Sequence, residues 1–154
     1  MNIDKTNISN LTFSLHKECS PTHPICEALR NQVRGYNFSK VGAFEINNYI
    51  LAYHNENNNL MAGLCACCRL GVFNIELLWV DESLRKQRLG SRLLEKAEEC
   101  ARKDNAIYMK VNTATFQALD FYLKNGYEVF AKLPIFVANI ENQYDYFLIK
   151  HLKR

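Results

Sequence analysis

Hydrophobic residues along the chain follow two spacings, which divide the sequence into expected strands and helices. Strands are predicted where apolar and polar residues alternate, or where short apolar runs are bounded by turn residues. These segments are Leu11–Leu15, Tyr49–His54, Leu60–Arg69, Val72–Val80, Ile107–Asn112, Tyr127–Leu133 and Tyr144–Leu152. Helical spacing predicts three more elements: one opened by Pro24, one from Arg88 to Lys103, and one from about Phe116 to Lys124.

Turn-forming residues separate these segments. The Asn-rich stretch 55–59 predicts a hairpin turn, and Gly71 predicts a second turn. We expect Gly35 to end the first helix or to bend it into a second short helix, and Gly126 to cap the third. The resulting order, β-α(α)-β-β-β-α-β-α-β-β, predicts an α/β (α+β) fold with a mixed sheet and helices on both faces. No linker separates a second domain, so we expect residues 1–154 to form a single domain.

The composition is that of an ordinary folded protein. The chain has 154 residues, 48% of them apolar and 23% charged, with a net charge of +3. These values argue against disorder, and the charge is too small to indicate nucleic-acid binding by itself. No apolar run approaches the ~20 residues that span a bilayer, and residues 1–10 lack the basic and apolar parts of a signal peptide. We therefore expect a cytoplasmic protein that does not bind membranes.

Six cysteines raise the question of a metal site, but their spacing does not favour one. The cluster Cys65-Ala66-Cys67-Cys68 contains one Cys-x-x-Cys spacing, but no second pair occurs elsewhere to complete a zinc site. On a strand, Cys65 and Cys67 would share one face and Cys68 the other, where each would act as a small core residue. We expect no metal, and reduced, buried thiols that fit a cytoplasmic protein.

The segment between Val80 and Leu94 carries the main chemical signal. A buried strand ends at Val80, a polar loop follows, and a helix begins near Arg88. The first-turn amides of a helix lack intrahelical partners and bind phosphate, and Gly90 would let a ligand approach the backbone closely. Four side chains add positive charge: Arg85, Lys86, Arg88 and Arg92. The alternative is a solvated basic loop with an incidental glycine.

This loop resembles a signature of the GNAT superfamily of acyl-CoA-dependent N-acetyltransferases: Gln or Arg, two residues, Gly, one residue, then Gly or Ala. The segment Gln87-Arg88-Leu89-Gly90-Ser91-Arg92 matches it at Gln87 and Gly90. Arg92 stands where a small residue is usual, and its side chain can point to solvent. Because Lys86 and Arg88 stand where many members have Gly, we expect a loop that is stiffer than the family's norm.

A second segment, residues 115–127, is similar to the family's Asn-x-x-Ala-x-x-Leu-Tyr-x-x-x-Gly-Phe. Thr115 replaces the Asn, which affects one side-chain hydrogen bond to the cofactor. The positions in register are Ala118, Phe121, Tyr122, Gly126 and Tyr127. An amphipathic helix ended by Gly would give part of this pattern, but both motifs occur at the family's spacing. The element order also follows the family from about Leu11 to Leu152.

The resemblance implies a sheet of roughly six to seven strands, in which a bulged central strand splays from its parallel neighbour, Ile107–Asn112. It implies acetyl-CoA as the acyl donor, with the pantetheine arm in the cleft and direct attack by an amine, so no Cys nucleophile is required. The residues expected to contact the cofactor are Leu78, Trp79, Val80, Arg85, Lys86, Gln87, Arg88, Leu89, Gly90, Ser91, Arg92, Thr115, Phe121, Tyr122 and Lys124.

Two residues are candidates for proton transfer. By the resemblance, Tyr122 is the general acid, since a phenol with an ordinary pKa of about 10 stays protonated at neutral pH; the alternative is a core tyrosine. Glu76 is the candidate base, directly or through water, because a carboxylate in an apolar strand needs a partner or a wet cleft. Strand alternation places it on the same face as Leu78 and Asn74, and the alternative is a salt-bridged or edge-exposed Glu.

Other functions remain open from the sequence. A non-catalytic module that binds acyl-CoA would share these motifs, although Tyr122 beside an intact phosphate loop favours an enzyme. A nucleic-acid-binding domain built on Arg85–Arg92 is weaker, because the rest of the chain is nearly neutral. In the family the acceptor is shaped by the segments that correspond to residues 19–45 and 134–143, and often by a partner in a homodimer. A polyamine, an amino acid, an antibiotic, a protein N-terminus and a lysine all fit.

Overall fold

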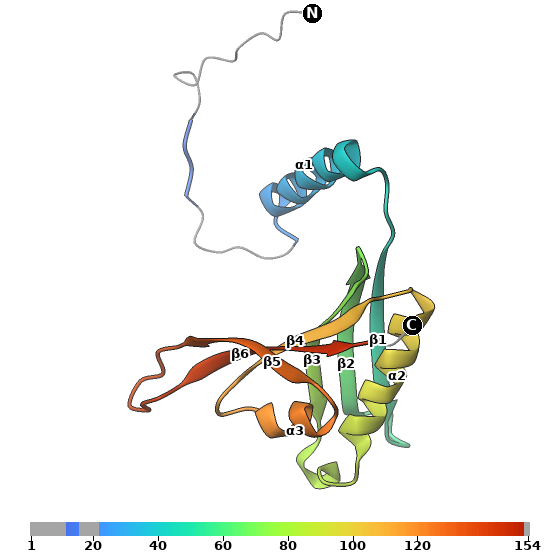
Figure 1. The fold of residues 1–154 in the computed structure, drawn as a ribbon, viewed down its shortest axis with the longest axis vertical. Coiled ribbons are helices and arrows are strands. Elements are labelled where there is room, and N and C mark those ends of the chain that lie inside the picture. The colour runs from blue at the N-terminus through green and yellow to red at the C-terminus, as the bar shows by residue number, and fades with distance from the viewer. Residues whose placement is uncertain (1–11, 16–21, 153–154) are drawn as a thin grey trace, which may run out of the picture. The chain divides into compact units, whose positions relative to one another are not determined.

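The chain divides into two compact units, residues 1–43 and residues 44–154. The computed structural model describes residues 12–15 and 22–152 (Figure 1). In the first unit, helix α1 spans Pro24–Val41. Its start is capped by His23, whose Nδ1 accepts a hydrogen bond from the Ile25 N–H at 3.2 Å. It ends at Gly42, which adopts a φ of 78° and donates to the Phe38 carbonyl.

Two expectations for this unit are wrong. Helix α1 continues through Gly35 instead of ending or bending into a second helix there. A single interior glycine costs a helix only about 1 kcal/mol, which good neighbouring residues can offset. The expected strand at Leu11–Leu15 is also not formed: residues 12–15 have no strand structure, and Leu11 lies outside the described residues. Alternation alone does not make a strand, because its backbone groups also need a partner strand.

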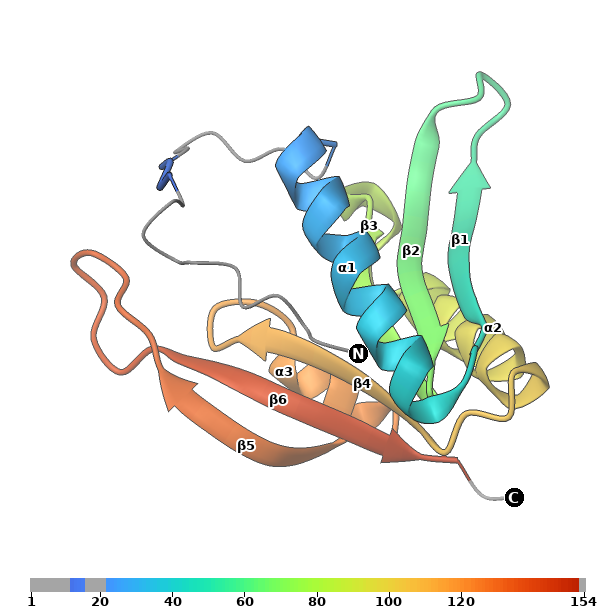
Figure 2. The same cartoon turned by 90° about the horizontal axis from the view of Figure 1, so that it is seen from above.

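The second unit is built on a mixed six-stranded sheet with the order β1-β2-β3-β4-β6-β5 (Figures 1 and 2). The pair β3–β4 is parallel, and the other neighbouring pairs are antiparallel. The strands are β1 (Ile46–His54), β2 (Leu60–Arg69), β3 (Val72–Val80), β4 (Tyr108–Ala114), β5 (Glu128–Pro134) and β6 (Tyr144–His151). The sequence predicted each of these six within a few residues, so the mixed α/β sheet is confirmed.

Two helices and a short 3-10 helix connect these strands. The 3-10 helix η2 (Glu82–Leu84) and helix α2 (Leu89–Lys103) lie between β3 and β4, and α3 (Leu119–Lys124) lies between β4 and β5. Helix α3 is shorter than expected, since the sequence predicted a helix from about Phe116. No helix in the described parts of the chain combines the length and apolarity needed to cross a membrane.

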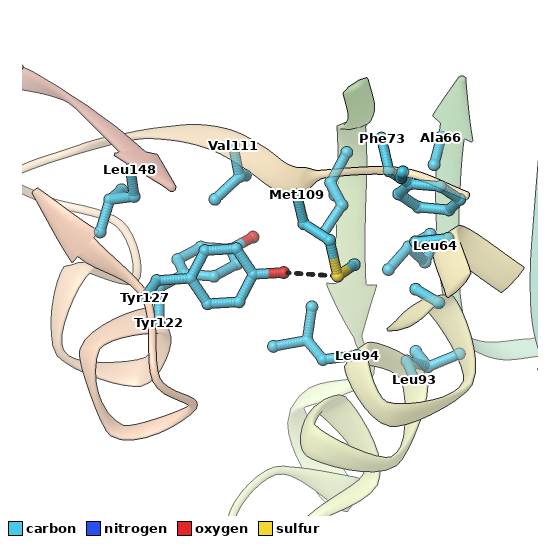
Figure 3. Close-up of a cluster of buried hydrophobic side chains, with 14 of the residues drawn as sticks. Leu64, Ala66, Phe73, Leu93, Leu94, Met109, Val111, Tyr122, Tyr127 and Leu148 are labelled. Carbon is cyan, nitrogen blue, oxygen red and sulfur yellow. Dashed lines mark hydrogen bonds between the residues drawn. The ribbon is translucent and has the colours of Figure 1, made fainter. Parts of the chain in front are cut away.

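The core of this unit lies between one face of the sheet and helices α2 and α3 (Figure 3). On β2, Ala62, Leu64, Ala66 and Cys68 are buried, as the alternation of a strand requires. They share one cluster with the apolar stripe of α2 and with Tyr122 of α3. The predicted division of the cysteines between two faces is confirmed: Cys68 is in the core, while Cys65 and Cys67 occupy the alternate positions. The expectation that the thiols are buried is wrong for the other described cysteines, since Cys26, Cys65, Cys67 and Cys100 are partly exposed.

Glu98 joins α2 to β6 and to its own helix. Its carboxylate lies 2.6 Å from the Lys150 Nζ and 2.6 Å from an Arg102 nitrogen, and its side chain is only 21% exposed. Burial alone would raise the pKa of Glu98, but the hydrogen bonds from Lys150 and Arg102 outweigh it and lower the pKa. The ion pairs of Glu98 with Lys150 and Arg102 therefore stabilise the folded state when Glu98 is ionised.

We expect Glu98→Gln to lower the free energy of unfolding by about 1 kcal/mol at pH 7. Because the folded-state pKa is lowered, this contribution is complete above the ordinary Glu value of about 4.3 and is lost as the pH falls through the folded-state value. Urea denaturation of both proteins across this range should show the difference shrinking in acid. Glu99→Gln is the control, since Glu99 is exposed; an equal loss there would contradict the assignment.

Candidate functional site

A cleft opens where β3 and β4 diverge. The two strands pair only at their starts, where Val72–Asn74 is in register with Tyr108–Lys110. Beyond Asn74, a cavity of about 750 Å³ lies between them. Its walls include the second half of β3, the loop into α2, the end of β4 and the start of α3. The strand pair expected to splay therefore does so.

A β-bulge at Glu76 accompanies this divergence. Ile75 is in register with Ala66 and Leu77 with the preceding residue, Cys65, so Glu76 is the extra residue on β3. The bulge shifts the alternation by one: Leu78 and Val80 pack against the core, as Ile75 does before the bulge. The expectation that Asn74, Glu76 and Leu78 share a face by strict alternation is therefore wrong.

Most of the expected site residues line the cleft. Both proposed proton-transfer residues, Glu76 and Tyr122, are among them. Of the expected cofactor contacts, the cleft is lined by Leu78, Trp79, Val80, Arg85, Lys86, Arg88, Leu89, Gly90, Ser91, Phe121 and Tyr122. Four others are not among the lining residues: Gln87, Arg92, Thr115 and Lys124. Ala118, a position of the second motif, also lines the cleft. The lining residues that the sequence did not single out are Ile75, Leu77, Leu84, Val111, Asn112, Thr113, Phe116 and Gln117.

The basic loop at one end of the cleft has a strained backbone. Lys86 and Arg88 adopt φ values of 63° and 62°. This left-handed conformation costs a residue with a side chain roughly 1–2 kcal/mol. By the resemblance, Lys86 and Arg88 stand at positions where many family members have Gly. Arg88 is also the N-cap of α2, and its side chain makes no capping hydrogen bond. The uncapped first turn of this 15-residue helix and its basic side chains fit an anionic group such as a pyrophosphate.

Gly90 has a packing role that the sequence did not indicate. It is buried in the first turn of α2, and a Cβ atom there would lie 3.1 Å from the Phe121 Cζ and 3.2 Å from its Cε2. The missing side chain therefore lets the Phe121 ring of α3 pack on the start of α2. The position serves this contact as well as any close approach of a ligand.

In Gly90→Ala, overpacking against Phe121 should cost about 1–3 kcal/mol, whereas alanine gains about 1 kcal/mol over glycine in a helix. We therefore expect the free energy of unfolding to fall by up to about 2 kcal/mol. Phe121→Leu in the same chain should recover part of this loss, because it removes the ring atoms that the new methyl meets. Thermal or urea unfolding of the single and double variants measures this coupling. Gly35→Ala is the matched control: a Cβ there meets no described atom within 4 Å, so the variant should not be less stable. Additive effects at Gly90 and Phe121 would refute the packing role.

Tyr122 combines burial with a position on the cleft wall. It is 5% exposed and lines the cleft. Its ring packs edge-on against Phe121, with ring centroids 5.1 Å apart, and against Tyr127, with ring centroids 5.5 Å apart; Figure 3 shows Tyr122 beside Tyr127. Burial raises the pKa of Tyr122 to about 12. The phenol is therefore protonated throughout the physiological range, as a proton donor to a leaving group must be. The buried environment also means that the ring has a structural role.

Glu76 has a different environment. It is exposed at the bulge and is the one carboxylate among the described residues that line the cleft. Burial raises the pKa of the neighbouring Cys67 thiol; Arg69 opposes this effect, and the Glu76 carboxylate adds to it. Glu76 thus places negative charge in a cleft whose other end carries Lys86 and Arg88.

The Thr115 side chain makes hydrogen bonds within the protein and does not line the cleft. Its hydroxyl accepts a hydrogen bond from the Tyr144 N–H at 2.8 Å and donates to the Tyr144 carbonyl at 3.1 Å. Its own N–H donates to the same carbonyl at 2.9 Å. These bonds fasten the end of β4 to the start of β6. The Thr115 side chain, which stands at the position of the family's Asn, therefore makes a structural contact.

Comparisons with known proteins identify the family of this chain. Residues 45–129 match the family model described as the acetyltransferase (GNAT) domain. The chain is 36% identical over 98 residues to the Blasticidin-S acetyltransferase of Streptomyces morookaense, which covers 63% of this chain and 70% of that protein.

Solved structures share the fold. A crystal structure from Agrobacterium tumefaciens, of a protein named as an acetyltransferase, superposes with a TM-score of 0.83 at 25% identity and covers 92% of this chain and 100% of that one. An aminoglycoside 6'-N-acetyltransferase complexed with coenzyme A superposes with a TM-score of 0.57 at 20% identity, covering 70% of this chain and 74% of that one. This second likeness concerns the fold alone.

Proposed function

Because the chain belongs to the GNAT family of acetyltransferases, we propose that it transfers an acetyl group from acetyl-CoA to a primary amine by direct attack. One observation carries the proposal. A single cleft has the uncapped, basic start of α2 at one end, a buried phenol on its wall, and one carboxylate at the bulge of β3. An anionic acyl donor, a leaving thiolate and a cationic amine each have a complementary group there.

The donor is best accommodated with its phosphates at the basic loop. Lys86 and Arg88 supply charge, and the first-turn amides of α2 supply hydrogen-bond donors. On β3, Leu78 and Val80 pack their side chains against the core, and the diverging strands leave backbone groups for the pantetheine arm. The thioester of acetyl-CoA supplies the acetyl group to the amine.

Direct attack fits the residues at hand. No cysteine is among the lining residues in the described chain: Cys65 and Cys67 lie on β2, outside the cleft. We propose that Glu76 first takes a proton from the incoming ammonium, through water or directly, and that the neutral amine nitrogen then forms its bond to the thioester carbon. As the carbon–sulfur bond breaks, the Tyr122 hydroxyl gives its proton to the departing sulfur, and the second proton of the attacking nitrogen, released as the amide forms, restores the Tyr122 hydroxyl.

The charge of Glu76 favours a cationic acceptor, and the similarity to a Blasticidin-S acetyltransferase suggests a small-molecule antibiotic as a first candidate. The test is an acetyl-CoA consumption assay with blasticidin S, aminoglycosides, polyamines, amino acids, and peptides with free N-termini or lysines. Amine-dependent release of coenzyme A is expected with at least one class. Tight binding of acetyl-CoA without turnover on any of them would instead indicate a binding module.

A further inference from the structure

Gln117 lies in the turn between β4 and α3, and its side-chain oxygen is fixed by the protein. The Oε1 atom accepts a hydrogen bond from the Ala114 N–H at 2.8 Å and a longer one from the Thr113 hydroxyl at 3.4 Å. Thr113 is buried, and its Oγ1 in turn accepts from the Ala118 N–H at 3.2 Å. A backbone N–H can only donate, so the atom that faces Ala114 must be the amide oxygen. The orientation of the Gln117 amide is therefore determined.

This arrangement uses only half of the amide. The structure shows no hydrogen bond from the Gln117 Nε2 to any described part of the chain, although Gln117 lines the cleft and is exposed. An amide whose oxygen is held in place presents its two N–H donors with little loss of side-chain entropy on binding. An amide NH₂ group donates hydrogen bonds and does not accept them, so its partner must be a hydrogen-bond acceptor. The ammonium of the substrate amine also only donates, so it cannot be this partner.

We propose that the Gln117 Nε2 donates a hydrogen bond to a carbonyl oxygen of the acyl-CoA in the cleft. This proposal rests on the proposed function above. Acyl-CoA carries such oxygens in the amides of its pantetheine arm and in its thioester. Thr115, the nearby side chain at the position of the family's Asn, already uses its hydroxyl in hydrogen bonds to the Tyr144 backbone. Gln117 then binds the ligand through Nε2 and also holds the β4–α3 turn through the hydrogen bonds of its Oε1 with Ala114 and Thr113, which we call the staple.

Two variants separate the donor from the other effects of the side chain. Gln117→Glu keeps an oxygen for Ala114 and Thr113 but replaces the NH₂ donor with an acceptor and adds a negative charge. Gln117→Met is neutral and of similar length, and it removes both the donor and the staple. The loss of the donor is thus the one change that the two variants share. Dissociation constants for acetyl-CoA and for coenzyme A are measured by calorimetry, with thermal unfolding as the check on folding.

Both variants are expected to weaken acetyl-CoA binding by about 3- to 10-fold, the range for one hydrogen bond. An equal loss for coenzyme A assigns the bond to the pantetheine arm, and a loss confined to acetyl-CoA assigns it to the thioester carbonyl. Weakening in Gln117→Glu alone would mean charge repulsion, and weakening in Gln117→Met alone would mean loss of the staple; either overturns the proposal. Unchanged affinity in both also overturns it while leaving the proposed function intact, whereas a wild-type chain that binds neither ligand overturns both.

Discussion

Tyr122→Phe is expected to lower kcat by about 10²–10⁴-fold, the usual contribution of a general acid. The substitution removes only the hydroxyl, so the ring contacts with Phe121 and Tyr127 remain and the fold should be preserved. The dissociation constant for acetyl-CoA should change little, because the hydroxyl is assigned to the leaving sulfur. Since burial raises the pKa of Tyr122 to about 12, its ionisation should cause no fall in rate up to about pH 10.

Tyr127→Phe is the matched control for this experiment. Tyr127 is equally buried, at 4% exposure, and burial raises the pKa of its phenol as well. Its hydroxyl, however, donates to the Met109 Sδ at 3.7 Å (Figure 3). Tyr127 is also not among the residues that line the cleft. Turnover should therefore survive in this variant. If Tyr122→Phe also stays within about three-fold of the wild type, Tyr122 is only a core residue.

The positions of most strands and helices along the chain were predictable because they depend on local pattern. The continuous apolar run Leu60–Cys68, which is bounded by turn residues, and the helical spacing in Leu89–Lys103 are both strong signals, and the structure has a strand and a helix at these positions. The expected break at Gly35 failed because an interior glycine is a small local cost that a helix can absorb. The expected strand at residues 11–15 failed for a different reason: pairing is a long-range property that alternation does not encode.

The site was predictable where a motif fixes the backbone, and less so where side chains choose between partners. The loop from Arg85 to Ser91 contributes most of its residues to the cleft, as a helix start following a strand should. Thr115 instead bonds to Tyr144, which is 29 residues further along the chain, so no local pattern could show it. The role of Gln117 depends likewise on which atom faces Ala114. The bulge at Glu76 reverses the faces that alternation predicts, and only the register with β2 shows it.

The bulge gives Glu76 its special position, and Glu76→Gln tests the base assignment. The amide keeps the size of the side chain but cannot take a proton, so we expect kcat to fall by about 10²-fold or more at neutral pH. At higher pH the acceptor amine loses its proton in solution, and the variant then needs no base. The ratio of variant to wild-type rate should therefore rise towards alkaline pH. Steady-state rates from about pH 6 to pH 10, with a saturating amine, measure this ratio.

Glu56→Gln supplies the control, because Glu56 is an exposed carboxylate in the β1–β2 turn and does not line the cleft. It should leave the rate and its pH profile unchanged. An effect of Glu76→Gln on KM alone would mean that the carboxylate attracts a cationic acceptor without moving its proton. A reduced but constant ratio across the pH range would point the same way: water or backbone carbonyls would then take the proton, and the negative charge at the bulge would serve binding.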